Sequence, residues 1–582
     1  MITRSEIFDM NAAGSPLSGL AAQAVEHLSG LRELAKFYET LPRDSDESFL
    51  EVVRRELGLA CDVTAGDLAR IPRSGPVVVV ANHPFGAAEG IVLARVLGIV
   101  RNDVRLLANQ LLGRIPELRD NLILVDPFHP GASRPNVSGL RRAIAHVARG
   151  GMLATFPAGA VSHLQLEKMT VVDPEWNVAI ARLVRRTKAT VLPVYFPGTN
   201  GPLFQLAGLL HPNLSTALLA HALLDRRHTR IEMRIGRPIA FSRIAHLQSD
   251  EEMIVHLRRR TYLLANRTCT GVAQPRPNRK GAMIAPAHPG EALAREVDAL
   301  PSSALLVSSG ELDVLLATPE RIPILLREIG RLREITFRAA GEGSGNAVDL
   351  DAFDAFYSHL FLWNRAKREL AGAYRLGVVD PIVRRYGISG LYTSTLFRYS
   401  PAFFKALGAH AVEMGRSWVA AEYQKSYSPL LLLWKGIATF VARNPESCVL
   451  FGPASISNDY APSSRALMAR YLLDAVAAKE LMPHVAPRAP FRAARNLEPA
   501  SDFEELQELL QEIENGQRAL PVLLRQYLNV GGRVAALNVD RQFSDVLDAL
   551  VVVDLRATPE KMLARYMTPD GARTFLEHHG TS

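Results

Sequence analysis

A histidine with an acidic residue six positions later is the first pair in this sequence whose types and spacing could perform chemistry. Residues 82–90 read NHPFGAAEG and contain His83 and Glu89. Histidine suits general base catalysis because its ordinary pKa lies near neutrality, and a carboxylate can fix its tautomer and stabilise the imidazolium. The glycine and alanines between them allow the chain to turn back. The alternative is a loop histidine beside a solvated glutamate, and these residues alone favour neither.

A run of β-branched residues directly precedes this pair, since residues 77–80 read VVVV. Such a run is typical of a strand buried on both faces, and open α/β sheets place ligand sites just beyond the carboxyl ends of their strands. Further strand patterns alternate with helical patterns, which predicts an α/β domain with a largely parallel sheet. The strand patterns occupy residues 104–108, 122–125, 152–156 and 191–196, and the helical ones residues 139–148 and 178–186.

A second group of charged residues lies in the C-terminal half of the chain. A strand pattern at residues 370–376 contains Arg375, and Glu413 stands three positions before Arg416. If that segment is helical, Glu413 and Arg416 share a face and form a salt bridge, which needs no functional explanation. Three carboxylates come earlier in the same half, at Asp349, Asp351 and Asp354.

Length and charge limit the class of protein to which these residues belong. A chain of 582 residues is too long for one hydrophobic core, so we expect at least two domains. The net charge of +8 suits nucleic acid, an anionic bilayer, or acidic partners such as acyl carriers and phospholipids. No zinc-ligand spacing and no RNA-binding or helix-turn-helix signature is present, so we expect neither a metal nor a nucleic acid partner.

Cysteine usage and the apolar runs indicate the compartment. The three cysteines are far apart and form no disulfide framework, which is typical of the reducing cytoplasm. The sequence begins without a secretory signal pattern, and no run reaches the roughly 20 apolar residues that a membrane span needs. We therefore expect a cytoplasmic protein that lies on the inner face of the membrane without crossing it.

A segment rich in proline, glycine and basic residues, 268–290, separates two α/β regions and is predicted to be a linker. The expected order is a helical segment at residues 1–70, a first α/β domain at 71–267 and a second at 291–582. Strand patterns in the second domain occupy residues 334–339, 370–376, 449–451, 533–537 and 550–555, and helical patterns lie between residues 401 and 443.

Three ordered blocks in the first domain resemble the lysophospholipid and glycerol-phosphate acyltransferase family. They are the Asn-His block at residues 82–90, the Phe-Pro-x-Gly block that begins at Phe156, and the proline-containing strand block VLPVYF at residues 191–196. The resemblance covers residues 72–239 and is closest to the branch linked to ornithine-lipid synthesis. It implies O-acyl transfer with His83 as general base and Glu89 as the residue that orients it. It also implies an acceptor and acyl-chain site shaped by Asn82, Phe156, Pro157 and Gly159.

Two departures from the family pattern concern this first site. The acidic residue of the Asn-His block is usually aspartate, whereas this chain has Glu89, one residue later. The Phe-Pro-x-Gly block usually contains a glutamate at the position of Ala158 or Ala160, and both are alanine here. These departures predict either an altered acceptor specificity or a weak site.

The second domain resembles the hemolysin-like branch of the GNAT acyltransferases, which includes ornithine and glycine N-acyltransferases. The resemblance runs through residues 328–460 and includes VDLDAFDAFYSHLFLW, LAGAYRLG and VEMGRSWVAAEYQ. It implies transfer of a 3-hydroxyacyl group from acyl carrier protein to an amino acid α-amine, with Glu413 as base or amine binder. Arg375 and Arg416 would bind the substrate carboxylate or the phosphopantetheine phosphate. For the three aspartates (Asp349, Asp351 and Asp354), the alternatives are a site for a cationic group and a helix N-cap cluster.

Together the two resemblances predict a bifunctional enzyme of aminolipid synthesis. The second domain would N-acylate an amino acid, ornithine or glycine, and the first would esterify the 3-hydroxyl of the resulting lyso-aminolipid. We expect acyl carrier protein as partner and donor, no permanently bound cofactor, and work at the membrane surface. The alternatives are an acyltransferase with a single activity and a non-catalytic protein that binds lipid or acyl carrier protein.

Overall fold

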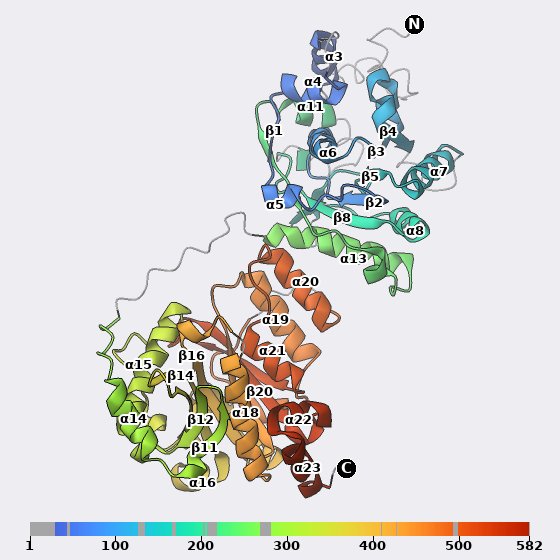
Figure 1. Cartoon of the computed structure of the whole chain (residues 1–582). Coiled ribbons are helices and arrows are strands. Elements are labelled where there is room, and N and C mark those ends of the chain that lie inside the picture. Colours follow the sequence, from blue (N-terminus) through green and yellow to red (C-terminus); the bar gives the residue numbers. More distant parts are fainter. Residues whose placement is uncertain are drawn as a thin grey trace. The chain divides into compact units, whose positions relative to one another are not determined.

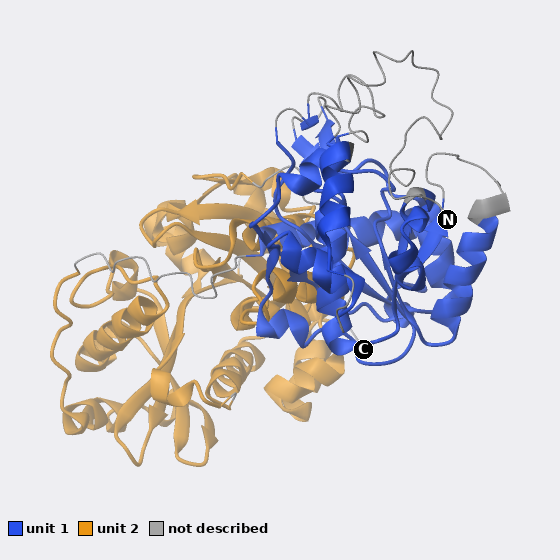
Figure 2. Cartoon of the chain, turned by 90° about the horizontal axis from the view of Figure 1, so that it is seen from above, with its two compact units in different colours: residues 1–267 blue, residues 268–582 orange. Residues whose placement is uncertain are grey.

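The computed structural model divides the chain into two compact units, residues 1–267 and 268–582 (Figure 2). Two segments with sequence predictions, the start of the N-terminal helical segment (1–29) and most of the linker (268–280), lie outside the described residues. The structure describes residues 30–42, 47–125, 134–165, 170–201, 204–205, 218–267, 281–408, 410–426, 428–492 and 499–580.

The first unit is built on a six-stranded sheet, in which only the edge strand β10 is antiparallel to its neighbour β8. The predicted, largely parallel sheet is therefore confirmed. The strand order across the sheet is β10 (Arg234–Ile235), β8 (Thr190–Tyr195), β2 (Val77–Ala81), β5 (Met152–Thr155), β3 (Val104–Asn109) and β4 (Leu122–Val125).

Helices cover both faces of this sheet, which is why the central strand β2 is apolar throughout. Val77 and Val79 pack on one face against α4 and α6, whereas Val78 and Val80 pack on the other against α7, α8 and α13 (Figure 1). This alternation is the two-residue period of a strand. The helix bounds are α4 (Phe49–Glu56), α6 (Ala87–Val100), α7 (Arg134–Ala148), α8 (Val178–Thr187) and α13 (Asp250–Leu263).

The predicted helical segment before residue 70 contains one strand that the sequence did not indicate. Helix α3 (Leu31–Thr40) precedes α4, but β1 (Ala60–Asp62) is extended and pairs in parallel with β9 (Arg230–Glu232). The prediction of helix is therefore wrong at β1, because its partner lies far along the chain and leaves no local signal. The smaller elements of this unit are α5 (Ala65–Leu68), β6 (His163–Gln165), β7 (Thr170–Val172), α11 (Leu219–Leu224) and α12 (Phe241–Ile244).

The second unit is built on an eight-stranded sheet whose pairs are antiparallel except for one, β16 with β17. These two strands pair at only two positions, Val412 with Leu450 and Glu413 with Phe451. The strand order is β11 (Leu305–Ser309), β12 (Leu312–Ala317), β13 (Ser358–Asn364), β14 (Glu369–Val378), β16 (Val412–Val419), β17 (Val449–Ile456), β20 (Val546–Asp554) and β19 (Arg533–Asp540).

Helices also pack on this second sheet. Phe361 of β13 lies in the core beneath α14 and α15, and its neighbour Leu360 points to the opposite face, towards Gly436 of α18. The strands β15 (Phe397–Tyr399) and β18 (Val485–Pro487) form a separate short antiparallel pair. The main helices are α14 (Gly290–Asp298), α15 (Pro323–Ala339), α16 (Val379–Tyr386), α17 (Pro401–Leu407), α18 (Ser428–Arg443), α19 (Pro462–Asp474), α20 (Phe503–Ile513), α21 (Val522–Asn529), α22 (Glu560–Met567) and α23 (Pro569–His578).

One strand prediction in the second unit is wrong. Residues 334–339, predicted as a strand, form the end of α15, because Leu325 and Ile329 bury one face of that helix and outweigh the local β propensity. The helical patterns predicted between residues 401 and 443 correspond to α17 and α18, and β16 lies between these helices. Glu413 and Arg416 therefore lie on a strand, and the helical salt bridge between them does not form.

None of the helices in the described residues has the length and apolar character needed to cross a bilayer.

The close approach of β16 and β17 gives a test of this fold. A Cβ atom on Gly452 would stand 2.0 Å from the carbonyl oxygen of Met414, whereas one on Gly415 would meet nothing nearer than Tyr392 Cδ1 at 4.0 Å. Gly452→Ala should lower the free energy of unfolding by about 1–3 kcal/mol, and the control Gly415→Ala should cost less than half as much. Urea unfolding followed by tryptophan fluorescence checks this, and equal stability of the two variants would contradict the strand arrangement.

Candidate active sites

The structure places His83 and Glu89 in direct contact beyond the carboxyl end of β2. His83 Nδ1 lies 2.9 Å from Glu89 Oε1. The imidazole stacks on the Phe156 ring, with the centroids 4.2 Å apart and the planes at 23°. Its side chain keeps 18% of its surface exposed, whereas that of Glu89 has none. The glutamate that replaces the usual aspartate therefore reaches the histidine, and one edge of the ring remains accessible.

Three donors converge on the buried Glu89 carboxylate. Oε1 accepts hydrogen bonds from the backbone N–H groups of Phe85 and Gly86, both at 2.8 Å, in addition to the contact with His83. Glu89 is in the first turn of α6, where the helix dipole also favours a negative charge. Gly86 has φ 100°, a conformation that favours glycine and lets the loop close over the carboxylate. Oε2 has no hydrogen-bond partner among the described residues.

Two buried polar residues fix the backbone around His83. The Asn82 amide donates to the Phe196 carbonyl at 2.9 Å and accepts from the Phe196 N–H at 2.7 Å, which ties the end of β2 to the end of β8. Asn82, predicted to bind substrate, is 3% exposed and so acts as a positioning residue. Asp173, which the sequence analysis missed, accepts from the His83 N–H at 3.1 Å and from the Ser162 hydroxyl at 2.5 Å.

The Phe-Pro-x-Gly block forms a tight turn beside the histidine. The Gly159 N–H donates to the Phe156 carbonyl at 3.0 Å, and Gly159 has φ 66°. Pro157 is buried, and its carbonyl accepts from the Asn177 N–H at 2.9 Å. Of this block, Phe156 alone contacts the imidazole directly. Pro157 and Gly159, predicted to shape the acceptor site, set the turn that holds the ring in place.

This arrangement allows proton transfer at one defined atom. A carboxylate can only accept at Nδ1, so the neutral imidazole carries its proton there and keeps the Nε2 lone pair free. Nε2 can accept a proton from a hydroxyl group, and the Glu89 charge stabilises the imidazolium that forms.

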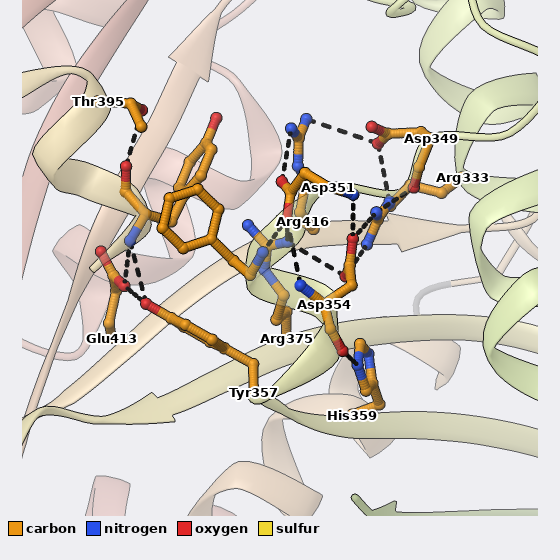
Figure 3. A network of polar contacts seen from close by, with 12 residues as sticks. Arg333, Asp349, Asp351, Asp354, Tyr357, His359, Arg375, Thr395, Glu413 and Arg416 are labelled. Atoms are coloured by element: carbon orange, nitrogen blue, oxygen red, sulfur yellow. Dashed lines mark hydrogen bonds and ion pairs between the residues drawn. The ribbon is translucent and has the colours of Figure 1, made fainter. Parts of the chain in front are cut away.

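In the second unit, three arginines and three aspartates form one network (Figure 3). Arg333 of α15 donates from Nε to Asp349 and from Nη2 to Asp354, both at 2.8 Å. Arg375 of β14 donates from Nη1 to Asp351 at 2.6 Å. With three charges of each sign, the network is balanced by its own residues.

Arg416 joins this network through an irregularity in β16. The β14–β16 register shifts between Ala373 and Arg375, which inserts an extra residue in β16. Arg416 has φ 49°, a left-handed conformation that costs about 1–3 kcal/mol for a residue other than glycine. The bulge directs its guanidinium towards the acids, where Nη1 lies 3.5 Å from Asp349 and Nη2 3.3 Å from Asp351.

The aspartates make contacts of both kinds that the sequence allowed, namely helix N-capping and pairing with cations. Asp351 caps the short helix at Ala352–Ala355, since its side chain accepts from the N–H groups of Phe353 and Asp354. The N-cap interpretation is therefore confirmed for Asp351 and Asp354, which form a capping box, whereas the Asp349 side chain pairs with Arg333. The cations beside the aspartates are the protein's own arginines, so a substrate amine would have to enter at the open edge. That edge is Asp351, whose side chain is 24% exposed, and Arg416, at 12%.

Charge and burial act in opposite directions on the pKa values of the network. Burial alone would raise the pKa of Asp354, but the charges and hydrogen bonds of Arg333 and Arg375 outweigh it and hold that pKa below its ordinary value. Burial would lower the pKa of Arg375, and the charges of Asp354 and Asp351 reverse this and raise it. Asp354 and Arg375 are consequently ionised at neutral pH.

Glu413, the predicted base, is bound on all sides. It is 1% exposed, its Oε1 accepts from the Thr393 N–H at 2.7 Å, and its Oε2 accepts from the Tyr392 N–H at 3.0 Å. Oε2 also accepts a short hydrogen bond from the Tyr357 hydroxyl (Figure 3). Glu413 thus fixes the turn that carries Tyr392, whose ring lies 5.0 Å from the guanidinium carbons of both Arg375 and Arg416. Its role as base stays a prediction.

Three residues that these sites use are not indicated by any pattern in the sequence: Asp173, Arg333 and Tyr357. Asp173 has no local signal, because its partners lie 11 and 90 positions away. Arg333 was overlooked because the end of its helix was predicted as a strand. Tyr357 lies inside the segment quoted for the resemblance, but no spacing rule pairs it with a glutamate 56 positions later.

Two family models match separate parts of the chain. Residues 26–271 match the family model described as Acyltransferase, and residues 332–435 match the model described as Acetyltransferase (GNAT) domain. The first match contains the His83–Glu89 pair. The second contains the whole arginine–aspartate network and Glu413.

Some proteins similar to this chain are named N-acyltransferases, and others are named O-acyltransferases. Glycine N(alpha)-acyltransferase of Bacteroides thetaiotaomicron is 29% identical over 286 residues, covering 46% of this chain and 82% of that protein. Lyso-glycine lipid O-acyltransferase of Phocaeicola vulgatus is 28% identical over 222 residues, covering 37% and 77%. L-ornithine N(alpha)-acyltransferase of Rhodobacter capsulatus is 29% identical over 252 residues, covering 40% and 88%.

The buried network predicts a specific loss of stability. Asp354→Asn leaves Arg333 and Arg375 partly unpaired and should lower the free energy of unfolding by about 3–5 kcal/mol at pH 7. The control Asp380→Asn removes a surface pair with Arg384 and should cost less than about 1 kcal/mol. Urea unfolding followed by tryptophan fluorescence measures both.

The same variant has an expected pH dependence. The pKa of Asp354 is lowered in the folded chain, so its stabilisation is complete above the unfolded carboxyl pKa, about 3.9, and is lost as the pH falls through the folded value. The difference between wild type and Asp354→Asn should therefore shrink below about pH 4. A constant difference from pH 7 to pH 3 would contradict an ionised Asp354.

Proposed function

We propose that this chain, which matches an acyltransferase family model at residues 26–271 and a GNAT model at residues 332–435, makes an aminolipid in two steps. The second unit N-acylates an amino acid with a 3-hydroxyacyl group, and the first unit esterifies that hydroxyl with a second acyl chain. The observation that carries the proposal is the presence of an oriented His83–Glu89 pair and a complete charged network in one chain.

In the first step, a zwitterionic amino acid binds at the open edge of the charged network. The substrate carboxylate pairs with Arg416, and the ammonium lies beside Asp351. Both groups keep some exposure, whereas Asp349 and Asp354 are almost fully covered. The ammonium gives up one proton to water at this open edge, and its nitrogen attacks the thioester carbon. The C–N bond then forms, the C–S bond breaks, and the thiolate takes the second proton from nitrogen.

The end of the pairing between β16 and β17 supports acyl carrier protein as the acyl donor. Beyond Glu413 and Phe451 the facing edges of these strands no longer pair with each other. An extended arm that carries amides, such as phosphopantetheine, can bind to strand edges by adding its own hydrogen bonds. The chain's net charge of +8 is complementary to an acidic carrier protein.

In the second step, the 3-hydroxyl of the lyso-aminolipid gives its proton to His83 Nε2. The oxygen attacks the thioester carbon of a second acyl donor, the C–O bond forms, and the C–S bond breaks. The imidazolium returns its proton to the leaving thiolate, so the enzyme ends the cycle unchanged. Having both sites in one chain raises the effective concentration of the intermediate at the second site, and the amphipathic intermediate favours work at the membrane surface.

A group of acidic residues beside Arg416 supports a cationic amino acid, such as ornithine, as the acceptor. Asp548 of β20 and Asp540 of β19 lie on one face of neighbouring strands, and Glu342 is close to Asp548. None of these three forms an ion pair within the described part of the chain. Burial, followed by the charges of Asp540 and Glu342, raises the pKa of Asp548 to about 7, although Ser455 and Arg416 oppose the shift. A side-chain ammonium would relieve this crowding of carboxylates.

Lipid analysis of single variants tests the two-step order. Cells that express His83→Ala should accumulate the N-acylated lyso-lipid, because the hydroxyl keeps its proton. Cells that express Asp351→Asn should make neither lipid, although asparagine retains the N-cap of the adjoining helix. Mass spectrometry of extracted lipids measures both. If the His83 variant makes the doubly acylated lipid at wild-type level, His83 is not the base of the esterification. If the Asp351 variant makes the lyso-lipid at wild-type level, Asp351 does not bind the substrate amine.

The acceptor is tested by pH and by one substitution. Because an ammonium favours the ionised form of Asp548, the KM for ornithine should fall as the pH rises through about 7. In Asp548→Asn, that pH dependence should disappear and the preference for ornithine over glycine should drop at least 10-fold. Purified full-length enzyme supplied with either amino acid from pH 6 to pH 8 provides the comparison. An unchanged preference would point to glycine or another neutral acceptor.

A further inference from the structure

Arg226 lies at the same sheet edge as His83, although it belongs to neither sequence block of the first site. It follows α11, and its guanidinium carbon stands 3.9 Å from the centroid of the Phe85 ring. Its Nη2 donates to the Thr199 carbonyl at 2.7 Å. Phe85 belongs to the loop after β2, and Thr199 follows β8. The guanidinium therefore spans the carboxyl ends of two adjacent parallel strands, where α/β sheets place their ligands.

No anion within the described part of the chain pairs with Arg226. Its neighbour Asp225 pairs instead with His221 at 3.2 Å, and the bond to Thr199 is a single bond to a neutral carbonyl. Burial lowers the pKa of Arg226, and the nearby charges of Glu89 and Asp225 oppose this shift without forming an ion pair with it. A guanidinium that is half removed from water and has free N–H groups is poised for an anionic ligand, since bidentate pairing with a carboxylate would restore the lost solvation.

We propose that Arg226 binds the carboxylate of the lyso-aminolipid and so orients its 3-hydroxyl towards His83 Nε2. This inference rests on the proposed function. The N-acylated amino acid has lost its α-ammonium charge and keeps its carboxylate, so this carboxylate is the group that a cation can recognise next to the new amide. The Phe85 ring, which connects the arginine to the loop that carries His83, sets the separation between the anchored carboxylate and the base. Arg226 is thus a specificity residue for acceptors with a carboxylate head.

Two arginine substitutions provide a matched pair for the test. Arg226→Met keeps an unbranched stem on the Phe85 ring and removes the charge. Arg227→Met is the control, because Arg227 is exposed and stands 5.1 Å from the Phe37 ring, in α3. In full-length enzyme, we expect Arg226→Met to raise the KM for the lyso-aminolipid at least 10-fold, while the KM for the acyl donor changes less than 2-fold. Arg227→Met should leave both values unchanged.

An acceptor analogue separates binding of the carboxylate from a structural effect. In the carboxamide form of the same lyso-lipid, the carboxylate is replaced by a neutral amide of similar shape. Wild-type enzyme should use this analogue with a kcat/KM at least 10-fold lower than that of the carboxylate form. Arg226→Met should discriminate between the two less than 2-fold, because the group that reads the charge is gone. A variant that merely distorts the site would lose activity with both acceptors and keep the ratio.

Each outcome decides between distinct alternatives. An increased KM for the acyl donor in Arg226→Met, with the acceptor KM unchanged, would assign this arginine to the donor's phosphate and overturn the inference. Preference of wild-type enzyme for lysophosphatidic acid over the lyso-aminolipid would assign it to a phosphate head. If wild-type enzyme esterifies the lyso-aminolipid and Arg226→Met does so with the same KM, the inference alone fails. If wild-type enzyme esterifies no carboxylate-bearing lyso-lipid, the proposed function fails with it.

Discussion

The first unit depends on one buried carboxylate. Glu89 is fully covered, which is costly for an anion unless donors replace its water. The structure supplies them from three groups that the turn after β2 brings together: two backbone N–H groups and the His83 ring. The same contact that stabilises the anion therefore orients the base. Because the donors come from the loop itself, the pair is preorganised before any substrate arrives.

In the second unit, buried carboxylates are stabilised by a different arrangement. Its acids are balanced by arginines from separate elements, so that Arg333, Arg375 and Arg416 tie α15, β14 and β16 to the aspartate segment. Most of this network is closed, and only Asp351 and Arg416 reach its surface. The strained backbone at Arg416 places the guanidinium there. Stability and binding are thus concentrated in the same few residues, and variants at the closed end should affect folding before they affect chemistry.

Sequence patterns anticipate the first site better than the second. The contact between His83 and Glu89 follows from six residues of local chain, a buried strand and a glycine turn, all of which can be seen in sequence. Asp173 and Arg226 cannot be predicted in this way, because their partners come from distant loops that meet only at the sheet edge. In the second unit, the β-branched end of α15 suggested a strand. This error arises because packing against the sheet, rather than local propensity, decides that segment.

The central claim is that one chain contains two separate acyl-transfer sites, and mixing two inactivated forms tests it most directly. Purified His83→Ala and Asp351→Asn enzymes would be supplied together with ornithine and two thioesters of acyl carrier protein, one with a 3-hydroxyacyl group and one with an unsubstituted acyl group, with each variant alone as the reference. We predict that the mixture forms the doubly acylated lipid, since the first variant makes the lyso-lipid and the second esterifies it. Neither variant alone should form this product. A mixture that yields no doubly acylated lipid, or a single variant that yields it unaided, would contradict the account.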